Sequence, residues 1–296
     1  MEKKNLFKGL GVALVTPFRS DFSIDFEALG NLIQSQISAG VDFLCILGTT
    51  AETPCLTLAE KQAIVRFAVE KVEGRVPLLL GAGGNSTAAV VDYLNTADLN
   101  GIDGLLIVTP YYNKPSQEGL YQHFCTVAGA TELPIVLYNV PGRTGVNLSA
   151  ETTLRIAHEC KNVVAIKEAS GNISQIEDII KGAPDGFQVL SGDDAITFEL
   201  ITIGAAGVIS VVGNAFTAEF GKMVHSALIG NYNEALCIHR RFSDLYKLMT
   251  VDGNPSGVKA LLSEQGRIEN NLRLPLVPAT QATQARLKTV IDTFSI

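Results

Sequence analysis

The amino-acid sequence predicts an α/β protein, a (β/α)8 TIM barrel followed by a helical C-terminal region. Eight short apolar segments alternate with helical patterns along one continuous chain, which favours a closed barrel over an open doubly wound sheet. After the eighth apolar segment, helical patterns continue without further strands. We therefore expect a barrel over residues 1–230, with its active site at the carboxyl ends of the strands, and a three-helix appendix over residues 231–296.

The predicted strands contain mostly small and branched apolar residues, as in strands that are buried on both faces. Polar, aromatic and glycine residues follow most of them directly. The eight predicted strands are 11–16, 41–47, 77–81, 104–109, 134–138, 163–167, 187–191 and 207–210.

Helical periodicity fills the segments between these strands and the chain after them. Ser86, Ser116 and Ser149 stand where a side-chain oxygen is expected to cap the first turn of a helix. The predicted barrel helices are 26–39, 58–72, 86–100, 116–130, 149–160, 172–181, 196–203 and 218–230. The three helices of the appendix are 232–249, 257–265 and 280–293.

Composition excludes several classes of protein. The chain has 296 residues, 47% of them hydrophobic and 18% charged, and a net charge of -7 without any lysine or arginine run. This balance argues against binding to nucleic acid or to an anionic membrane. Apolar runs are far shorter than the roughly 20 residues of a membrane helix, and no signal-peptide pattern opens the chain. We expect a cytoplasmic protein.

Cysteine and histidine spacing predicts neither disulfides nor a metal site. The five cysteines contain no CxxC pair, which is typical of free thiols in a reducing compartment, and the four histidines contain no HxH or HExxH spacing. The glycine-rich segment 81–85 follows a predicted strand but lacks the spacing of a nucleotide-binding loop, so we interpret it as a tight turn. No cofactor is expected.

One lysine carries the strongest chemical signal. Lys167 ends the apolar strand Val163-Val-Ala-Ile-Lys167, where burial of a charged amine costs several kcal/mol. A desolvated, neutral amine is a nucleophile for carbonyl carbon and begins Schiff-base chemistry. The alternative is a structural lysine that pairs with Glu168 or extends to the barrel rim. The strand by itself leaves both interpretations open.

Four motifs in order resolve that choice. They are Gly48-Thr-Thr-Ala-Glu52, Tyr138-Asn-Val-Pro-Gly-Arg-Thr-Gly145, Ile166-Lys-Glu-Ala-Ser-Gly171 and Leu190-Ser-Gly-Asp-Asp194. With them the chain resembles the dihydrodipicolinate synthase / N-acetylneuraminate lyase family of Schiff-base aldolases over residues 6 to 290. The resemblance is greatest to members that condense pyruvate with L-aspartate 4-semialdehyde, the first committed step of lysine and diaminopimelate biosynthesis.

The resemblance implies a role for each catalytic residue. Lys167 forms an imine with the ketone of pyruvate, and Tyr138 donates and accepts protons, with Thr49 and Tyr112 completing a hydroxyl relay. Tyr112 reaches into the site of a neighbouring subunit, and the family is mostly tetrameric, built as a dimer of dimers. Without the family, both tyrosines could equally be rim aromatics that fill the barrel mouth.

Four further residues are expected to bind the substrates. Thr50, like Thr49, lies in a turn whose hydroxyls and amides suit the pyruvate carboxylate, and Ile209 corresponds to a position whose backbone contacts pyruvate. Gly192 corresponds to a rim position that lets substrate approach closely. Arg143 has the guanidinium fork suited to the carboxylate of the second substrate. Taken singly, without the family, these residues are better interpreted as ordinary turn, strand or solvated loop residues.

Two departures from the family pattern carry expectations of their own. Ala51 replaces the usual glycine of the Gly-Thr-Thr-Gly-Glu motif and could shift the loop that orients Thr49. Many family members are inhibited by lysine bound between subunits. Here Lys61 lies in the matching neighbourhood, and Ala89 stands where a glutamate is frequent, so we expect weak or absent inhibition by lysine.

Two other functions remain open from the sequence. One is a lyase for N-acetylneuraminate or a keto-deoxy sugar acid, which Arg143 argues against because the sugar aldehyde has no carboxylate for it to bind. The other is a non-catalytic barrel that has kept the scaffold, which the presence of Lys167, Tyr138, Thr49 and Tyr112 argues against.

Overall fold

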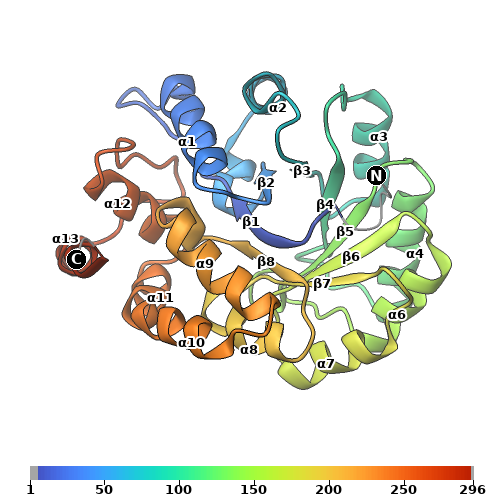
Figure 1. The fold of residues 1–296 in the computed structure, drawn as a ribbon. Helices are drawn as coiled ribbons and strands as arrows, with labels where there is room; N and C mark the ends of the chain where they lie inside the picture. The colour runs from blue at the N-terminus through green and yellow to red at the C-terminus, as the bar shows by residue number, and fades with distance from the viewer. Residues whose placement is uncertain (1–5, 295–296) are drawn as a thin grey trace.

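Eight parallel strands close into a barrel in the computed structural model, which describes residues 6–294. Each strand pairs with its neighbours along the chain, and β8 closes the ring against β1 (Figure 1). The predicted fold class is therefore confirmed. The strands are β1 (Gly9–Ala13), β2 (Phe43–Ile46), β3 (Leu78–Gly81), β4 (Gly104–Val108), β5 (Ile135–Asn139), β6 (Val163–Glu168), β7 (Gln188–Ser191) and β8 (Gly207–Ser210).

The first strand begins and ends earlier than the predicted range 11–16. Its register against β8 runs from Gly9 opposite Gly207 to Val12 opposite Ser210. Because β8 ends at Ser210, β1 has no partner on that side beyond this point. The polar residue that was expected at the end of the first strand, Thr16, lies in the loop that follows it.

An outer ring of helices covers the barrel (Figure 1). Ser86, Ser116 and Ser149 cap their helices as expected, each side chain accepting a hydrogen bond from a backbone N–H three residues later. The short α5 (Pro141–Thr144) was not predicted as a helix. The barrel helices are α1 (Phe26–Ser38), α2 (Leu58–Val72), α3 (Thr87–Thr96), α4 (Gln117–Ala128), α6 (Ala150–Glu159), α7 (Ile173–Gly182), α8 (Thr197–Thr202) and α9 (Thr217–Leu228).

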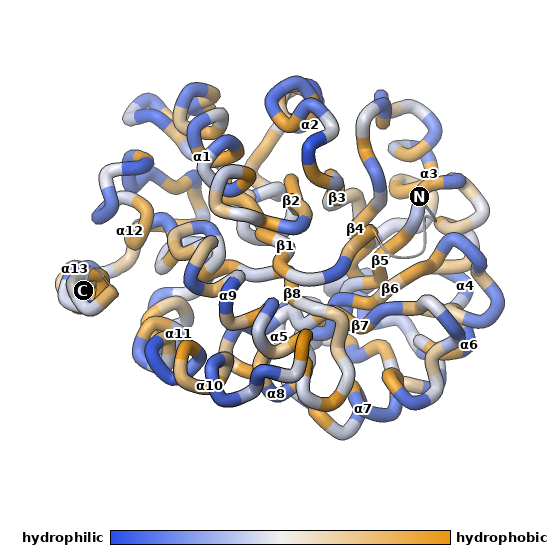
Figure 2. The backbone as a smooth tube through the Cα atoms, viewed as in Figure 1, coloured by the Kyte–Doolittle hydropathy of each residue, from blue (hydrophilic) through white to orange (hydrophobic). Residues whose placement is uncertain are grey.

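Side chains fill the barrel interior, so the barrel is a packed core and not a pore. Hydrophobic residues concentrate in the strands, while many outer turns are hydrophilic (Figure 2). Two predicted site residues, Tyr138 and Ile209, belong to this inner cluster. Its buried members are Phe7, Ala13, Phe43, Cys45, Leu79, Leu106, Val136, Tyr138, Val140, Ala165, Leu190 and Ile209.

The chain after the barrel forms helices, as predicted, but the range 232–249 differs from expectation. It is divided into α10 (Tyr232–Arg241) and α11 (Ser243–Val251), and these are followed by α12 (Ser256–Glu264) and α13 (Gln281–Phe294). Helix α10 packs against α8 and α9, whereas α11 and α12 pack against α13 (Figure 1). The division of the chain at residue 230 stays a prediction.

Phe242 explains the break between α10 and α11. Its backbone N–H donates to the carbonyl of His239, three residues earlier, which tightens the chain into a turn. Its ring is fully buried, 5.5 Å from that of Phe220 and 4.7 Å from that of Phe294. The turn allows this ring to enter an aromatic cluster against the barrel helix α9, a tertiary contact that periodicity does not reveal.

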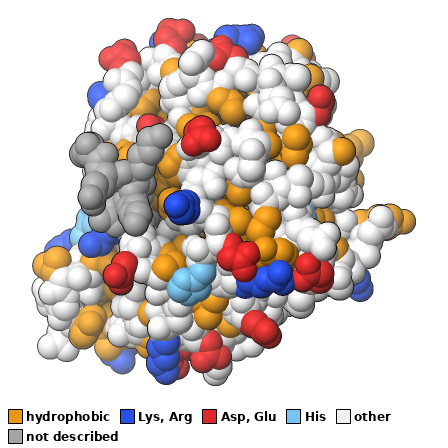
Figure 3. Space-filling model, turned by 90° about the vertical axis from the view of Figure 1, so that its right-hand side faces the viewer, with side chains coloured by type: hydrophobic (Ala, Val, Ile, Leu, Met, Phe, Trp, Pro, Cys, Tyr) orange, Lys and Arg blue, Asp and Glu red, His pale blue; other side chains and the backbone are white. Residues whose placement is uncertain are grey.

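The outer surface carries charges of both signs. On the face shown in Figure 3, acidic and basic side chains are interspersed with apolar ones, without a broad area of one sign. Within residues 6–294, no helix has both the length and the apolar character needed to cross a membrane.

Candidate active site

Lys167 and Tyr138 lie side by side at the carboxyl ends of β6 and β5. The two residues are register partners, and Leu190 of β7 lies opposite Lys167 on the other side. Lys167 is 5% exposed, and its Nζ is 4.3 Å from the centre of the Tyr138 ring. The predicted nucleophile and the predicted proton-transfer residue are therefore in contact.

The surroundings of Lys167 reject the structural interpretation in which it pairs with Glu168. Successive strand residues point to opposite faces, and the Glu168 carboxylate accepts hydrogen bonds from Asn139 (2.6 Å) and Ser170 (2.5 Å) outside the barrel interior. Burial raises the pKa of Glu168. Within residues 6–294, no carboxylate forms an ion pair with Lys167. Glu168 instead joins β5 to β6 behind the lysine.

A buried thiol lies on the interior side of Lys167. Cys45 of β2 is fully buried, and burial raises its pKa to about 11, with the positive charge of Lys167 acting in the opposite direction. The thiol therefore stays neutral near physiological pH and offers the amine no counter-ion. An amine without an anionic partner in an apolar site is the arrangement that Schiff-base chemistry requires.

Gly192 brings the loop after β7 directly against the lysine. Its N–H donates to the Glu168 carbonyl at 2.7 Å. A Cβ at this position would lie 2.8 Å from the Cβ of Ala169 and 3.1 Å from the Cε of Lys167. Only glycine fits here without displacing Lys167 or its strand.

The turn after β2 carries the two predicted threonines. It is a short 3-10 helix, η2 (Thr49–Ala51), in which Thr49 is half-buried and Thr50 is 2% exposed. The Thr16 hydroxyl donates to the Ala51 carbonyl at 2.8 Å, and the Thr53 hydroxyl donates to the Gly48 carbonyl at 2.8 Å. Both ends of the turn are thus fixed by side chains.

Three predicted residues lie at other places around the barrel mouth. Ile209 is buried in β8 within the interior cluster. Arg143 is exposed on α5, and its Nη2 donates to the backbone carbonyl of Asn254 at 3.3 Å. Tyr112 is 84% exposed in the loop after β4, with a left-handed φ of 79°. Across residues 6–294, no hydrogen bond joins the hydroxyls of Tyr112, Thr49 and Tyr138.

Comparison with known proteins identifies the family. The family model described as the dihydrodipicolinate synthetase family matches residues 6–294. This chain belongs to the dihydrodipicolinate synthetase family. The family model covers the segments that hold Lys167, Tyr138, Thr49 and Arg143, and the resemblance expected from the four motifs is confirmed.

Relatives of the dihydrodipicolinate synthetase family match over nearly their full length. The chain is 57% identical to the 4-hydroxy-tetrahydrodipicolinate synthase of Phocaeicola vulgatus, covering 98% of this chain and 97% of that protein. The enzyme of the same name from Parabacteroides distasonis is 58% identical with the same coverage. The crystal structure of the dihydrodipicolinate synthase of Thermotoga maritima matches with a TM-score of 0.95 and 43% identity, covering 98% of this chain and 99% of that one.

Ala51, the departure from the usual family motif, causes no backbone strain. It lies within the 3-10 turn, is 3% exposed, and has no positive φ. Left-handed backbone occurs one residue later, at Glu52, with a φ of 55°. An alanine therefore fits the conformation of this turn, and the expected shift of the loop has no cause in its backbone geometry.

Sequence reasoning missed the residues that hold this turn from the C-terminal region. Glu52 forms an ion pair with Lys259 of α12 at 2.5 Å, and both side chains are completely buried. Burial lowers the pKa of Lys259 to about 8, although Glu52 acts in the opposite direction. Asn254 donates from its Nδ2 to the Thr50 hydroxyl at 3.0 Å. The Gly-Thr-Thr-Ala-Glu motif ended at Glu52, but only the fold reveals its partner.

No group of three or more histidine, cysteine, aspartate or glutamate side chains that could hold a metal ion lies within residues 6–294. The predicted site residues bring together an amine at Lys167, a phenol at Tyr138 and the hydroxyls of Thr49 and Thr50. They suit imine formation and proton transfer at an α-keto acid.

Proposed function

We propose that this chain catalyses the reaction named for its relatives, that of a 4-hydroxy-tetrahydrodipicolinate synthase. In this reaction, a class I aldolase-type lyase condenses pyruvate with L-aspartate 4-semialdehyde in the biosynthesis of lysine and diaminopimelate. The observation that carries the proposal is Lys167, buried at the end of β6 against the Tyr138 ring without a carboxylate partner. Two relatives with this name are 57% and 58% identical over 98% of this chain.

The chemistry begins at the Lys167 Nζ. The neutral amine attacks the ketone carbon of pyruvate, and the resulting carbinolamine loses water to give a protonated imine. The imine accepts electrons as the methyl group loses a proton, which gives an enamine. The enamine carbon attacks the aldehyde carbon of the second substrate. The amine of that substrate then attacks the imine carbon, closes the ring and releases Lys167.

Protons must enter and leave at each of these steps. Tyr138 is placed to serve them because its ring contacts the Lys167 amine. In our proposal Thr49 and Tyr112 extend the relay to solvent, since hydroxyl groups can both donate and accept. Tyr112 is 84% exposed within one subunit, which suits a side chain that acts in the site of a neighbour.

Substrate binding is assigned to the rim of the same site. We assign the pyruvate carboxylate to Thr49 and Thr50, with backbone contacts at Ile209 and close approach at Gly192. Arg143 is exposed on the short helix α5, where its guanidinium can bind the carboxylate of aspartate semialdehyde.

Assembly and location follow from the same proposal. We propose a homotetramer built from tight dimers, because in our proposal Tyr112 acts in the site of a neighbouring subunit. All five cysteines are free, which suits the reducing cytoplasm. No nucleic acid or membrane is part of this proposal.

Borohydride trapping tests the assignment of Lys167. We expect pyruvate and borohydride to add one stable adduct per subunit, located on Lys167 by peptide mass analysis, and turnover with aspartate semialdehyde in an assay coupled to a dihydrodipicolinate reductase. Lys167→Arg should abolish both, whereas Lys161→Arg, on the exposed loop before β6, should keep both. Undiminished adduct in Lys167→Arg would overturn the assignment.

A chain that traps pyruvate but does not turn over aspartate semialdehyde would have a different second substrate. A wild-type chain that traps pyruvate but stays silent with aspartate semialdehyde and an active coupling enzyme would point to a sugar-acid aldolase. That result would remove Arg143 as the residue that selects the second substrate.

A further inference from the structure

Asn254 links the two loops that we assign to the two substrates. It lies in the turn between α11 and α12, far along the chain from both loops. Its side-chain Nδ2 donates to the Thr50 Oγ1 at 3.0 Å, and its backbone carbonyl accepts from the Arg143 Nη2 at 3.3 Å. One residue of the C-terminal region therefore contacts both carboxylate-binding positions.

The hydrogen bond from Asn254 limits the acceptors to which the Thr50 hydroxyl can donate. An amide nitrogen only donates, while a hydroxyl both accepts and donates. Thr50 accepts from Asn254, so its own hydrogen must go to another acceptor. Within residues 6–294, the Thr50 hydroxyl donates to no protein atom. Thr50 is 2% exposed, so bulk solvent has little access to this hydroxyl, and its hydrogen can go to a ligand in the site.

Neighbouring contacts fix the turn that carries Asn254. The Asp252 carboxylate accepts from the backbone N–H of Thr280 (2.9 Å) and from its hydroxyl (3.0 Å). The Ser256 hydroxyl donates to the Val277 carbonyl at 2.8 Å. Both sides of Asn254 are thus attached to the segment before α13.

The two halves of the Asn254 amide differ in their contacts. The Asn254 Oδ1 is buried and has no hydrogen-bond partner within the described residues. Leaving a buried acceptor unpaired costs about 1–3 kcal/mol. Among residues 6–294, the donation from Nδ2 to Thr50 is therefore the one hydrogen bond that the Asn254 side chain makes.

We propose that Asn254 is a positioning residue for both substrates. Its Nδ2 orients the Thr50 hydroxyl so that this hydroxyl donates to the pyruvate carboxylate. Its backbone carbonyl holds the Arg143 guanidinium toward the carboxylate of the second substrate. This inference rests on the function proposed above and adds to it the residue that couples the two binding loops.

Substitution of Asn254 separates its two contacts. A new side chain changes the contact with Thr50 but leaves the backbone carbonyl that accepts from Arg143. In Asn254→Asp the side chain keeps its shape but can only accept. It therefore takes the Thr50 hydrogen and adds a negative charge beside the pyruvate carboxylate. We expect the half-saturating concentration of pyruvate to rise about tenfold or more, the loss of one charge-assisted hydrogen bond. The KM for aspartate semialdehyde should stay within about twofold, since Arg143 keeps its contact.

The matched control is Asn270→Asp, which makes the same change of charge. Asn270 is a half-buried residue of the same C-terminal region, and it too has an unpaired buried Oδ1. Within residues 6–294, no hydrogen bond joins the Asn270 side chain to the Thr50 turn or to Arg143. This variant should bind pyruvate as the wild type does.

Pyruvate binding is measured as adduct trapped by borohydride against pyruvate concentration, and turnover is measured in the coupled assay. A selective rise in half-saturating pyruvate in Asn254→Asp would support the inference. Half-saturation within twofold of wild type in the folded variant would overturn it. Equal changes in both KM values and in kcat, together with a lowered Tm, would mean a structural role and would also overturn it.

A second variant keeps the test decisive if Asn254→Asp does not fold. Thr50→Val removes the hydroxyl that Asn254 orients, so Asn254→Ala should weaken pyruvate binding in the wild-type background and change it no further in Thr50→Val. Independent, additive effects would overturn the inference. Failure of the wild type to trap pyruvate would instead overturn the proposed function. The experiment therefore distinguishes a wrong function from a wrong role for Asn254.

Discussion

Around Lys167, single residues decide whether an amine can act as a nucleophile. Strand alternation sends Glu168 to the opposite face, where Asn139 and Ser170 bind it. Cys45 behind the amine is a neutral thiol because burial raises its pKa. The Tyr138 ring contacts the amine from the side. Among residues 6–294 the amine thus has no counter-ion, and a phenol lies beside it.

Replacing Gly192 should damage catalysis more than stability. Gly192→Ala introduces a Cβ 3.1 Å from the Lys167 Cε and 2.8 Å from the Ala169 Cβ, so the lysine or the loop must move. We expect kcat/KM to fall by about 10²-fold, the effect of a misplaced reacting group. Gly129→Ala is the control, because its Cβ would meet only ordinary contacts at 3.5 Å or more. Unchanged kinetics in Gly192→Ala would contradict this account.

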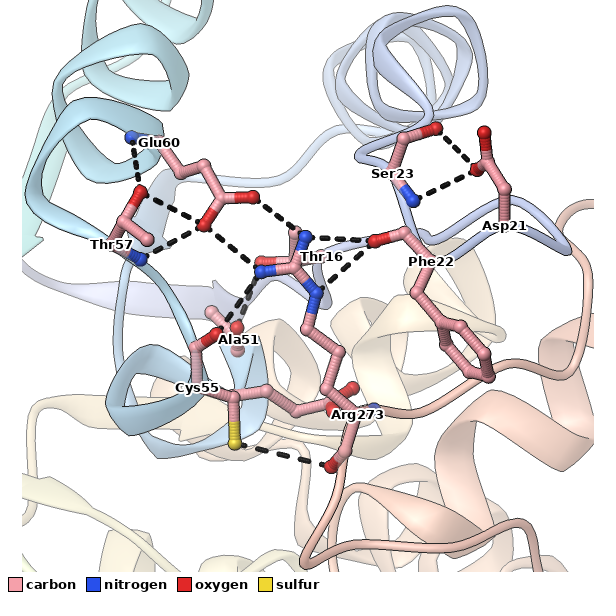
Figure 4. A network of polar contacts seen from close by, with 10 residues as sticks. Thr16, Asp21, Phe22, Ser23, Ala51, Cys55, Thr57, Glu60 and Arg273 are labelled. Carbon is pink, nitrogen blue, oxygen red and sulfur yellow. Dashed lines mark hydrogen bonds and ion pairs between the residues drawn. The ribbon is translucent and has the colours of Figure 1, made fainter.

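At the scale of elements, the C-terminal region holds the turn that carries Thr49 and Thr50. Lys259 of α12 pairs with Glu52, and the Arg273 backbone N–H donates to the same carboxylate at 2.9 Å. The Arg273 guanidinium also donates to the Glu60 carboxylate of α2 at 2.6 and 2.9 Å (Figure 4). The helices after the barrel therefore help to shape one of its rim loops.

Removing one partner of the buried ion pair should be costly. In Lys259→Met the Glu52 carboxylate would remain buried without its cation, so we expect a loss of about 3–5 kcal/mol in the free energy of unfolding. Urea denaturation measures this change. The double variant Glu52→Gln/Lys259→Met should recover part of the loss, because no unpaired charge remains. A single variant as stable as wild type would refute the assignment of this contact.

The Glu60–Arg273 contact should make stability depend on acid pH. Hydrogen bonds from Arg273 lower the pKa of Glu60 to about 2, against a usual value of 4.5. Because the folded pKa is the lower one, the stabilisation is complete above pH 4.5 and is lost as the pH falls toward 2. The Tm difference between wild type and Glu60→Gln should therefore shrink over that interval. Glu264→Gln, an exposed control, should follow the wild type at every pH.

At the scale of the whole molecule, our proposal for Tyr112 predicts that the active site depends on assembly. A tyrosine that is 84% exposed with a left-handed φ has few contacts within its own subunit to hold it there. If it completes a neighbour's site, an isolated subunit lacks one member of the proposed relay.

Mixed oligomers test this dependence on a second subunit. Lys167→Ala and Tyr112→Phe should each be nearly inactive alone. In a mixed dimer, one site has both its own Lys167 and a Tyr112 from its partner. Coexpression should restore about a quarter of the wild-type sites, since half of randomly formed dimers are mixed and each has one intact site. Activity that only averages the two single variants would place Tyr112 in its own subunit's site.

Regulation by lysine is a second property at this scale. Leu58, Lys61, Asn85 and Ala89 line one pocket of about 200 Å³, and no acidic residue is among its lining residues. A cationic ligand there would meet Lys61 without a carboxylate to balance it. We expect sub-millimolar lysine to leave the rate unchanged, while Ala89→Glu introduces sensitivity. Half-inhibition of the wild type by sub-millimolar lysine would refute this prediction.

The barrel, its order of strands and helices, and the lysine at the end of the sixth strand could all be predicted from the sequence. These features are encoded locally, because apolar periodicity, helix caps and strand ends depend on residues that are close together in the chain. Strand alternation between Lys167 and Glu168 was also readable, although motif matching does not use it. The division of the predicted helix 232–249 into two helices could not be predicted in this way, because it depends on the Phe242 ring packing against distant helices.

Only the tertiary structure decided which distant residues support the site. Asn254 lies 204 residues from Thr50, yet it forms a hydrogen bond with it. Lys259 likewise meets Glu52 from the opposite end of the chain. Neither residue carries a local pattern that predicts such a partner, because the contact depends on how the C-terminal helices dock on the barrel. The nucleophile Lys167 could be predicted from residues close to it in the sequence. The side chains that hold the rim loops are brought into place by tertiary packing.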